Sequence, residues 1–291
     1  MAVQNTKLGI WLMVATTLVF AIQDGFSRHL AETYNVWMVI TVRYWFFAAF
    51  VIAVAMRHPL GLRATTRSAF PLVQAGRGVL LAFEICVAVW AFATLGLINA
   101  HALFAAYPLL IAALSGPVLG EKVGWRRWTA IGIGFVGVLV ILRPGFAVFA
   151  PEALIAVLAA LMFALYGLVT RYVGQKDSAA VSLFWAGITG AVVLTPLGIW
   201  FWEPLAPRDW IYMAIICCTG VFSHWLMIRA YEVAEASAIQ PFAYLQLVFV
   251  SVIGVTIFNE VIQPNVLAGA LIVVGAGVFT IWRSGKVARQ G

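Results

Sequence analysis

The chain has 291 residues, of which 64% are hydrophobic and only 10% are charged, and its mean hydropathy is +1.00. A soluble domain carries about 25% charged residues, so this composition excludes a soluble globular protein and predicts a polytopic membrane protein. The net charge of +7 does not indicate nucleic acid as a partner, because Lys and Arg residues lie between apolar segments, as membrane orientation requires.

Ten apolar segments follow one another, each about as long as the ~20 residues that an α-helix needs to cross hydrocarbon. The connections are short and are marked by Pro, Gly or charge, as at His58-Pro59 and Glu203-Pro204. No extramembrane domain fits beside the segments, so the function is expected among the helices. The predicted spans of this all-α fold cover residues 8–27, 35–56, 70–95, 97–119, 125–142, 152–172, 178–202, 209–229, 238–258 and 264–283.

The distribution of positive charge predicts the orientation of the chain. With the N-terminus in the cytoplasm, thirteen Lys and Arg residues fall on the inner side, and only Arg28, Arg143 and Arg208 fall on the outer side. Both termini are therefore expected in the cytoplasm, with the chain in the plasma membrane, the inner membrane of a bacterial cell. The first apolar run lacks an Ala-x-Ala cleavage site and is interpreted as a retained helix.

Two similarities inside the chain predict an internal repeat. The turn with Glu121 follows the span 97–119, and the turn with Glu260 follows the span 238–258, 139 residues later. Phe20-Ala21-Ile22 likewise matches Phe163-Ala164-Leu165, 143 residues later. The chain thus divides into halves 1–145 and 146–291 with five spans each, and an odd number of crossings inverts the second half. Inverted repeats are typical of secondary transporters, whose substrate site lies near the midplane where the halves meet.

The order of motifs in the first half resembles the EamA-type branch of the drug/metabolite transporter superfamily. These motifs are an Arg-containing third span, Tyr107-Pro108, Gly120-Glu121-Lys122, Arg126-Arg127-Trp128, Gly132-x-Gly134-x-x-Gly137 and Arg143-Pro144-Gly145. The resemblance covers nearly the whole chain. It implies ten helices in two inverted halves, a central cavity lined by helices 1, 3, 4, 6, 8 and 9, and helices 5 and 10 packed outside. Through Glu84-Ile85-Cys86 the chain is also similar to the amino-acid and aromatic amino-acid exporters.

Ionisable groups within the spans are the first candidates for function, since a charge at the centre of a membrane helix costs at least ~2.5 to 3.5 kcal/mol. Gln74, Arg77 and Glu84 share one face of the third span. Arg43 lies at a similar depth in the second span, so an Arg43–Glu84 pair is possible. Glu84 is then either a counter-ion for a substrate amine or a proton carrier, or a charge that Arg43 neutralises to join two helices. Arg77 is taken as a structural charge partner, like Arg43.

The first and fourth spans add further polar candidates. Asp24, beside Gln23, faces the same two alternatives, with Arg43 or Arg28 as its neighbour. His101 shares a helical face with Phe104 and Pro108, and the 139-residue offset pairs it with Gln240 of the second half. Because proline removes a backbone donor, Pro108 and Pro241 are expected to bend their helices. The ring-bearing cavity candidates are Trp90, Tyr107, Tyr166, His224, Trp225 and Tyr244.

A pocket of rings with a few amide, imidazole and carboxylate groups suits a small amphipathic metabolite. The sequence therefore predicts a secondary transporter with alternating access for small metabolites, foremost amino acids, including aromatic ones. The family resemblance, and nothing else, implies that it is an exporter. Protons are candidate coupling ions through Glu84, Asp24 or His101. Nucleotide-like or vitamin-like molecules and drugs are the alternative cargo.

The rival class is an integral-membrane enzyme acting on lipid-linked substrates, which needs clustered catalytic groups. The four His residues are scattered over different spans and loops, so no enzyme activity, cofactor or metal is predicted. A receptor or assembly subunit is a third alternative, without a soluble domain to support it. Ala112-x-x-x-Gly116-x-x-x-Gly120 and the glycines of the fifth span predict close helix packing, within a monomer or a weak homodimer.

Overall fold

The computed structural model describes residues 5–57, 62–120, 125–142, 151–234, 239 and 242–287. Over these residues the chain is almost entirely α-helical and contains no β-strand, as predicted. The helices are α1 (Thr6–Ala31), α2 (Val36–Arg57), α3 (Leu62–Thr66), α4 (Pro71–Leu95), α5 (Leu97–Phe104), α6 (Tyr107–Leu119), α7 (Trp125–Leu142), α8 (Pro151–Val173), α9 (Ala179–Trp200), α10 (Asp209–Val233), α12 (Leu245–Ile257) and α13 (Pro264–Val287).

The helices confirm the expected membrane fold. By length and composition, α1, α2, α4, α8, α9 and α10 can each cross a membrane, and α5 with α6 passes the same test as one bent span. Shorter apolar helices lie within α7, α12 and α13. In the described part of the chain, these segments follow the order of the ten predicted spans.

Two local features differ from the prediction. The short helix α3 lies in a connection for which no helix was expected. The span 97–119 is also not one helix, because α5 ends at Phe104 and a turn at Ala105-Ala106 precedes α6. Pro108 is the second residue of α6, where its missing N–H is not needed, so the expected bend takes the form of a helix start. A turn also precedes α12 at Tyr244, 139 residues after Ala105.

Helices of the first half pair with helices of the second half throughout the bundle. Thus α1 packs on α10, α4 on α8, α2 on α9, and α7 on α13. The pair α1–α10 joins spans 1 and 8, and the pair α4–α8 joins spans 3 and 6. Spans 1 and 6 are counterparts in the repeat, and so are spans 3 and 8. Exchanging each span for its counterpart therefore converts one pair into the other. The pairs α2–α9 and α7–α13 convert into themselves. This is the contact pattern that a twofold relation between the two halves produces.

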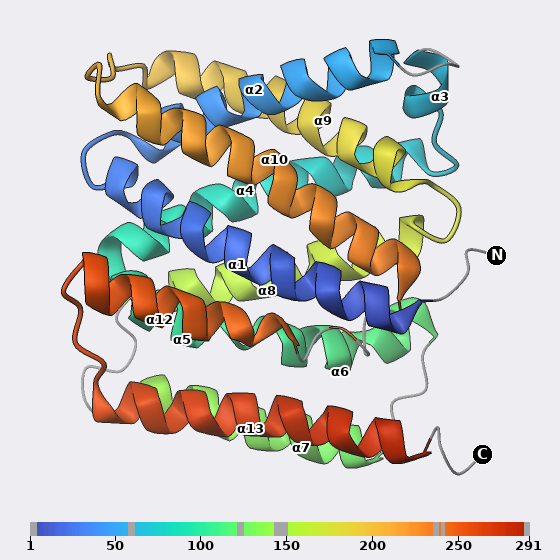
Figure 1. The fold of residues 1–291 in the computed structure, drawn as a ribbon, viewed down its shortest axis with the longest axis vertical. Coiled ribbons are helices and arrows are strands. Elements are labelled where there is room, and N and C mark those ends of the chain that lie inside the picture. The colour runs from blue at the N-terminus through green and yellow to red at the C-terminus, as the bar shows by residue number, and fades with distance from the viewer. Residues whose placement is uncertain are drawn as a thin grey trace.

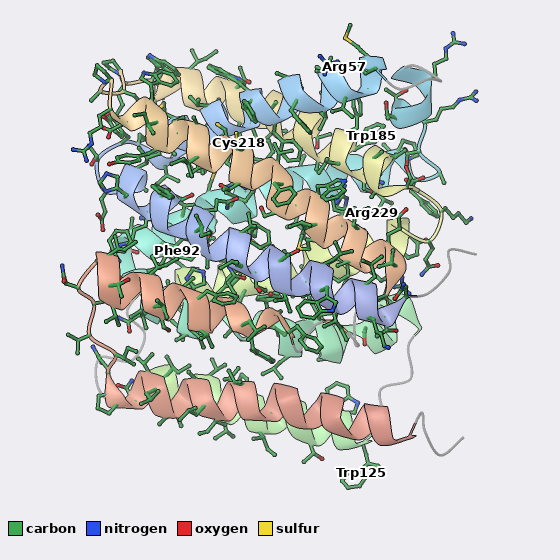
Figure 2. All side chains as sticks on the ribbon, viewed as in Figure 1. Arg57, Phe92, Trp125, Trp185, Cys218 and Arg229 are labelled. Carbon is green, nitrogen blue, oxygen red and sulfur yellow. The ribbon has the colours of Figure 1, made fainter. Side chains whose placement is uncertain are left out.

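The pair α7–α13 lies outside the main bundle, where it forms the lowest layer in Figure 1. A Cβ atom on Gly137 would lie 2.8 Å from the carbonyl oxygen of Gly269, and one on Gly269 would lie 2.5 Å from that of Gly137. Only glycine permits such a close backbone approach. Trp125, at the start of α7, points away from the bundle (Figure 2). The outer position expected for the fifth and tenth spans, which are α7 and α13, is thereby confirmed.

Near the end of the bundle that carries both termini, Arg77 is the centre of a buried polar network. Its Nε donates to Gln74 Oε1 at 3.0 Å, and its Nη1 donates to Tyr166 Oη at 3.1 Å. Its Nη2 donates to the Ser182 carbonyl. Gln74 Nε2 in turn donates to Asp177 Oδ2 at 2.9 Å. The network joins α4, α8 and α9, and the partners of Arg77 are neutral oxygens rather than a directly paired carboxylate.

We expect Gln74→Leu to destabilise the protein, because it removes the acceptor of Arg77 Nε and a donor to Asp177 together. A buried polar group left without a partner costs about 1–3 kcal/mol. The melting temperature in detergent should fall by at least roughly 3 °C. Gln175→Leu, at an exposed position, is the matched control and should leave it unchanged. Equal melting temperatures for the two variants would show that the network does not hold these helices together.

Candidate functional site

A small cavity lies at the centre of the bundle, between the two halves. Its volume is about 30 Å³, which is room for roughly two water molecules. Apart from Arg43 of α2, its lining comes from the predicted cavity spans 1, 3, 4, 6, 8 and 9. The lining residues are Phe20, Gln23, Asp24, Arg43, Glu84, Ile85, Ala88, Val89, Phe92, Phe104, Phe163, His224 and Gln246.

Arg43 presents an unpaired positive charge to this cavity. The residue is 1% exposed, and neither Nη1 nor Nη2 has a hydrogen-bond partner. The Arg43–Glu84 pair considered from the sequence is not formed, although both residues line the cavity. The guanidinium instead packs against α10, where a Cβ atom on Gly220 would lie 2.5 Å from Arg43 Nε. A buried donor without an acceptor is costly, so Arg43 is available for a ligand group.

His224 is a second buried group without hydrogen bonds. It is 1% exposed, and neither ring nitrogen has a partner. Three aromatic rings surround it, with centroid distances of 5.2 Å to Phe20, 6.4 Å to Phe47 and 6.1 Å to Tyr166. The rings place the imidazole at the cavity wall. One side of the cavity thus offers nitrogens from α2 and α10.

Asp24 and Gln246 form another side of the cavity, and the predicted cavity residue His101 bonds to them from outside the lining. Asp24 Oδ2 lies 3.0 Å from His101 Nε2 and accepts from Gln246 Nε2 at 2.9 Å. Asp24 therefore bonds to α5 and α12, and not to Arg43 or Arg28 as the sequence suggested. Sequence reasoning missed Gln246, although it stands 139 residues after Tyr107 and the repeat offset indicates it.

The remaining predicted residues divide into two groups. Tyr107, Tyr166 and Tyr244 are buried, where the first two support the cavity ring of Phe163 at centroid distances of 4.8 and 6.1 Å. Trp90 and Trp225, by contrast, are 52% and 41% exposed. Trp90 lies about 240° round α4 from Glu84, and Trp225 lines a groove at the surface between α2, α9 and α10. Neither tryptophan lines the central cavity, so their prediction as cavity residues was wrong.

Two predicted residues of the second half, Gln240 and Pro241, lie outside the described residues. Gln23 does line the cavity, and its Oε1 accepts from Ser223 Oγ at 3.3 Å. This bond joins α1 to α10.

Among the described residues, no group of three or more His, Cys, Asp or Glu is arranged to hold a metal ion.

Glu260 lies in the connection between α12 and α13, which Figure 1 shows at the end of the bundle opposite the start of α1 and the end of α13. Its carboxylate accepts from the amides of Leu97 and Ile98 at 2.7 and 2.8 Å, at the N-terminus of α5, and forms an ion pair with Arg28. Helix N-termini favour negative charge, so this contact joins the second half to α5 and α1 of the first half. Glu260, the acidic residue of the second turn of the repeat, therefore connects the two halves by hydrogen bonds and an ion pair.

An inverted bundle of apolar helices around a small, charged and ring-lined cavity is typical of a membrane transporter. The model of the EamA-like transporter family matches residues 7–143 and again residues 150–282. The chain belongs to this family, as its motifs suggested. The boundary predicted between residues 145 and 146 lies between the two matches, outside the described residues.

The relatives have different named substrates. The chain is 26% identical to an S-adenosylmethionine uptake transporter of Rickettsia prowazekii, over 96% of this chain and 94% of that protein. It is 26% identical to a riboflavin transporter of Vibrio cholerae, over 97% and 95% of the two chains, and 22% identical to the pseudopaline exporter CntI of Pseudomonas aeruginosa, over 95% and 96%. None of these three is named an amino-acid exporter, so they do not support that specificity.

A protein of known crystal structure shares the fold. It covers 97% of this chain and 98% of its own length, with a TM-score of 0.68 at 15% identity. The named relatives are transporters, in line with the expectation that the chain is not an enzyme.

We expect Glu260→Ala to expose the central cavity, because it removes the ion pair and the acceptor of the α5 amides together. The readout is the rate at which a polar thiol reagent labels Ala88→Cys, at a cavity position, in detergent-solubilised protein that lacks Cys86, Cys217 and Cys218. Labelling should accelerate several-fold.

The matched control is Glu32→Ala. Glu32 also pairs with Arg28, but it is 40% exposed, and such surface pairs contribute little. Labelling should not change in this variant. Equal labelling rates in Glu260→Ala and Glu32→Ala would contradict a closing role for Glu260.

Proposed function

We propose that the chain is an uptake transporter for a metabolite that joins an α-amino-acid group to a flat ring, the class to which S-adenosylmethionine belongs. The observation that carries this proposal is the buried Arg43 guanidinium, whose terminal nitrogens have no partner although they line the central cavity. A guanidinium fork matches a carboxylate in geometry and in charge. The cargo expected from the sequence was an amino acid. The proposal replaces it by a larger metabolite that contains an α-amino-acid group.

Glu84 supports an amphoteric substrate rather than a simple anion. Its side chain is 3% exposed and lines the cavity, without an ion pair to Arg43. A substrate that brings an ammonium or sulfonium group supplies the counter-ion that this carboxylate lacks. A zwitterion therefore compensates both buried charges at once, whereas a neutral molecule compensates neither.

Aromatic side chains supply the surface for the flat part of the substrate. Phe20, Phe104 and Phe163 line the cavity, and the centroids of their rings lie 6.2 Å (Phe20–Phe163) and 5.3 Å (Phe104–Phe163) apart. Aromatic faces favour stacking on another ring. Riboflavin, the substrate in the name of other relatives, also has a flat ring but lacks an amino-acid zwitterion. It is the second candidate.

Transport requires the bundle to change shape, because about 30 Å³ cannot hold such a molecule. The Glu260 contacts close one end, and the Arg77 network holds α4, α8 and α9 together near the other. Alternate release of the two ends exposes one cavity to each side in turn. With both termini in the cytoplasm, as the positive residues indicate, Glu260 closes the outer side.

The direct test is uptake of labelled S-adenosylmethionine into proteoliposomes. We expect Arg43→Gln and Glu84→Gln to lower uptake at least tenfold each, since leaving one buried charge without its partner costs about 2–5 kcal/mol. Arg229→Gln is the control, because Arg229 pairs with Glu232 near the surface (Figure 2). Its uptake should equal that of the unmodified protein.

Competition distinguishes the two candidate substrates. Unlabelled S-adenosylmethionine should block uptake strongly, whereas adenosine, which lacks the amino-acid group, should block it weakly. Accumulation of riboflavin without accumulation of S-adenosylmethionine, and with full activity in Arg43→Gln, would refute the zwitterion assignment.

A further inference from the structure

The cluster of Asp24, His101 and Gln246 has a property that substrate binding does not explain. The three side chains are 6%, 2% and 6% exposed, and they come from α1, α5 and α12. Both His101 Nε2 and Gln246 Nε2 converge on one atom, Asp24 Oδ2, at 3.0 and 2.9 Å. The cluster joins the first half to the second at the level of the cavity.

The geometry fixes where the imidazole carries a proton. His101 Nδ1 lies 3.0 Å from the carbonyl oxygen of Leu97. A carbonyl oxygen can only accept, so Nδ1 must be the donor and must carry hydrogen. The tautomer follows from the hydrogen-bond network, as it does for histidines in general.

A second proton then lies between His101 and Asp24. In a neutral imidazole with hydrogen on Nδ1, Nε2 has only a lone pair, and an ionised carboxylate has no hydrogen either. Two acceptors at 3.0 Å repel each other. Gln246 Nε2 carries two hydrogens and lies 2.9 Å from Asp24 Oδ2 and 3.4 Å from His101 Nε2. Neither hydrogen lies between Nε2 and Oδ2, so these two acceptors still face each other. The contact therefore requires one proton shared by Nε2 and Oδ2.

The surroundings shield this proton. The ring of Phe92 stacks on the imidazole at 4.4 Å between centroids, and Phe104 meets its edge at 5.9 Å. The titratable and charged groups of the neighbouring elements are Arg43 of α2, Glu84 of α4, Tyr107 of α6, Tyr166 of α8, His224 of α10, and Tyr244 before α12. Arg43 and Glu84 have opposite charges, so their fields at the pair oppose each other.

We propose that the Asp24–His101 pair is the binding site of a coupling proton, which the closed bundle holds and which leaves when α5 separates from α1. Without the proton, two acceptors face each other and the closed arrangement is disfavoured. The same helix α5 is held at its N-terminus by Glu260, so proton loss and opening act on one element. The step is a proton transfer from the pair to water, with no other bond changed. Of the three carriers considered from the sequence, this assigns the role to Asp24 with His101 rather than to Glu84.

The proton can be observed without any substrate. In ¹⁵N-histidine-labelled protein in nanodiscs, His29→Gln with His58→Gln leaves two imidazoles, His101 and His224. Because both nitrogens of His224 lack partners, its resonances differ from those of His101. At pH 7 we expect one imidazole with hydrogen bonds at both nitrogens and a proton at or shared by Nε2. Two imidazoles that each have a bare nitrogen would overturn the proposal, whatever the substrate is.

Coupling itself rests on the proposed transport function and is tested by flux. A pH gradient of one sign, imposed on proteoliposomes, should drive labelled S-adenosylmethionine above its equilibrium level. His101→Gln, outside the cavity lining, should keep exchange of labelled for unlabelled substrate but lose the gradient-driven accumulation, whereas the exposed His29→Gln should keep both. Exchange with no response to a gradient of either sign in the unmodified protein would refute proton coupling. Absence of exchange as well would refute the substrate proposal instead.

Discussion

Charged side chains buried within the membrane-spanning helices govern this structure. A charge in hydrocarbon is so unfavourable that the helices carrying Asp24, Arg43, Arg77 and Glu84 must turn these groups towards one another or towards a cavity. Asp24 and Arg77 are satisfied by hydrogen bonds from or to neighbouring helices. Arg43 and Glu84 are not paired with each other, and it is from these two charges that we infer a binding site at the centre of the bundle.

The two halves meet through polar contacts of different strength and position. Near the termini, Arg77 joins three helices through neutral oxygens and backbone. At the opposite end, one carboxylate, that of Glu260, accepts from two amides and an arginine. A single carboxylate is easier to release than a distributed network. In the proposed transport cycle, the Glu260 end is therefore expected to open first.

Much of this arrangement follows from the sequence because hydropathy and repeats constrain helices strongly. The spans, the inverted halves and the inward direction of Glu84, His101 and Asp24 all follow from the cost of placing polar groups in lipid. Partners are harder to predict, because depth along a helix does not give direction around it. Arg43 and Glu84 lie at similar depth without forming a pair, and Asp24 meets His101 instead of an arginine.

Aromatic residues show the same limit more clearly. Trp90 follows Glu84 by six residues, which places it about 120° away round α4, and it is exposed. The phenylalanines that line the cavity, such as Phe104 and Phe163, have no polar atom to distinguish them from packing residues. Gln246 could have been predicted from the sequence, since it stands at the position of the second half that is equivalent to Tyr107 of the first. Only the structure shows that it bonds to Asp24.

The most direct test of the central claim is an experimental structure of the protein in nanodiscs with S-adenosylmethionine bound. The account predicts a widened cavity between the halves, with the substrate carboxylate within hydrogen-bond distance of the Arg43 guanidinium and the purine among the phenylalanine rings. Substrate density in the surface groove lined by Trp225, or an Arg43 guanidinium still without a partner beside bound substrate, would contradict it.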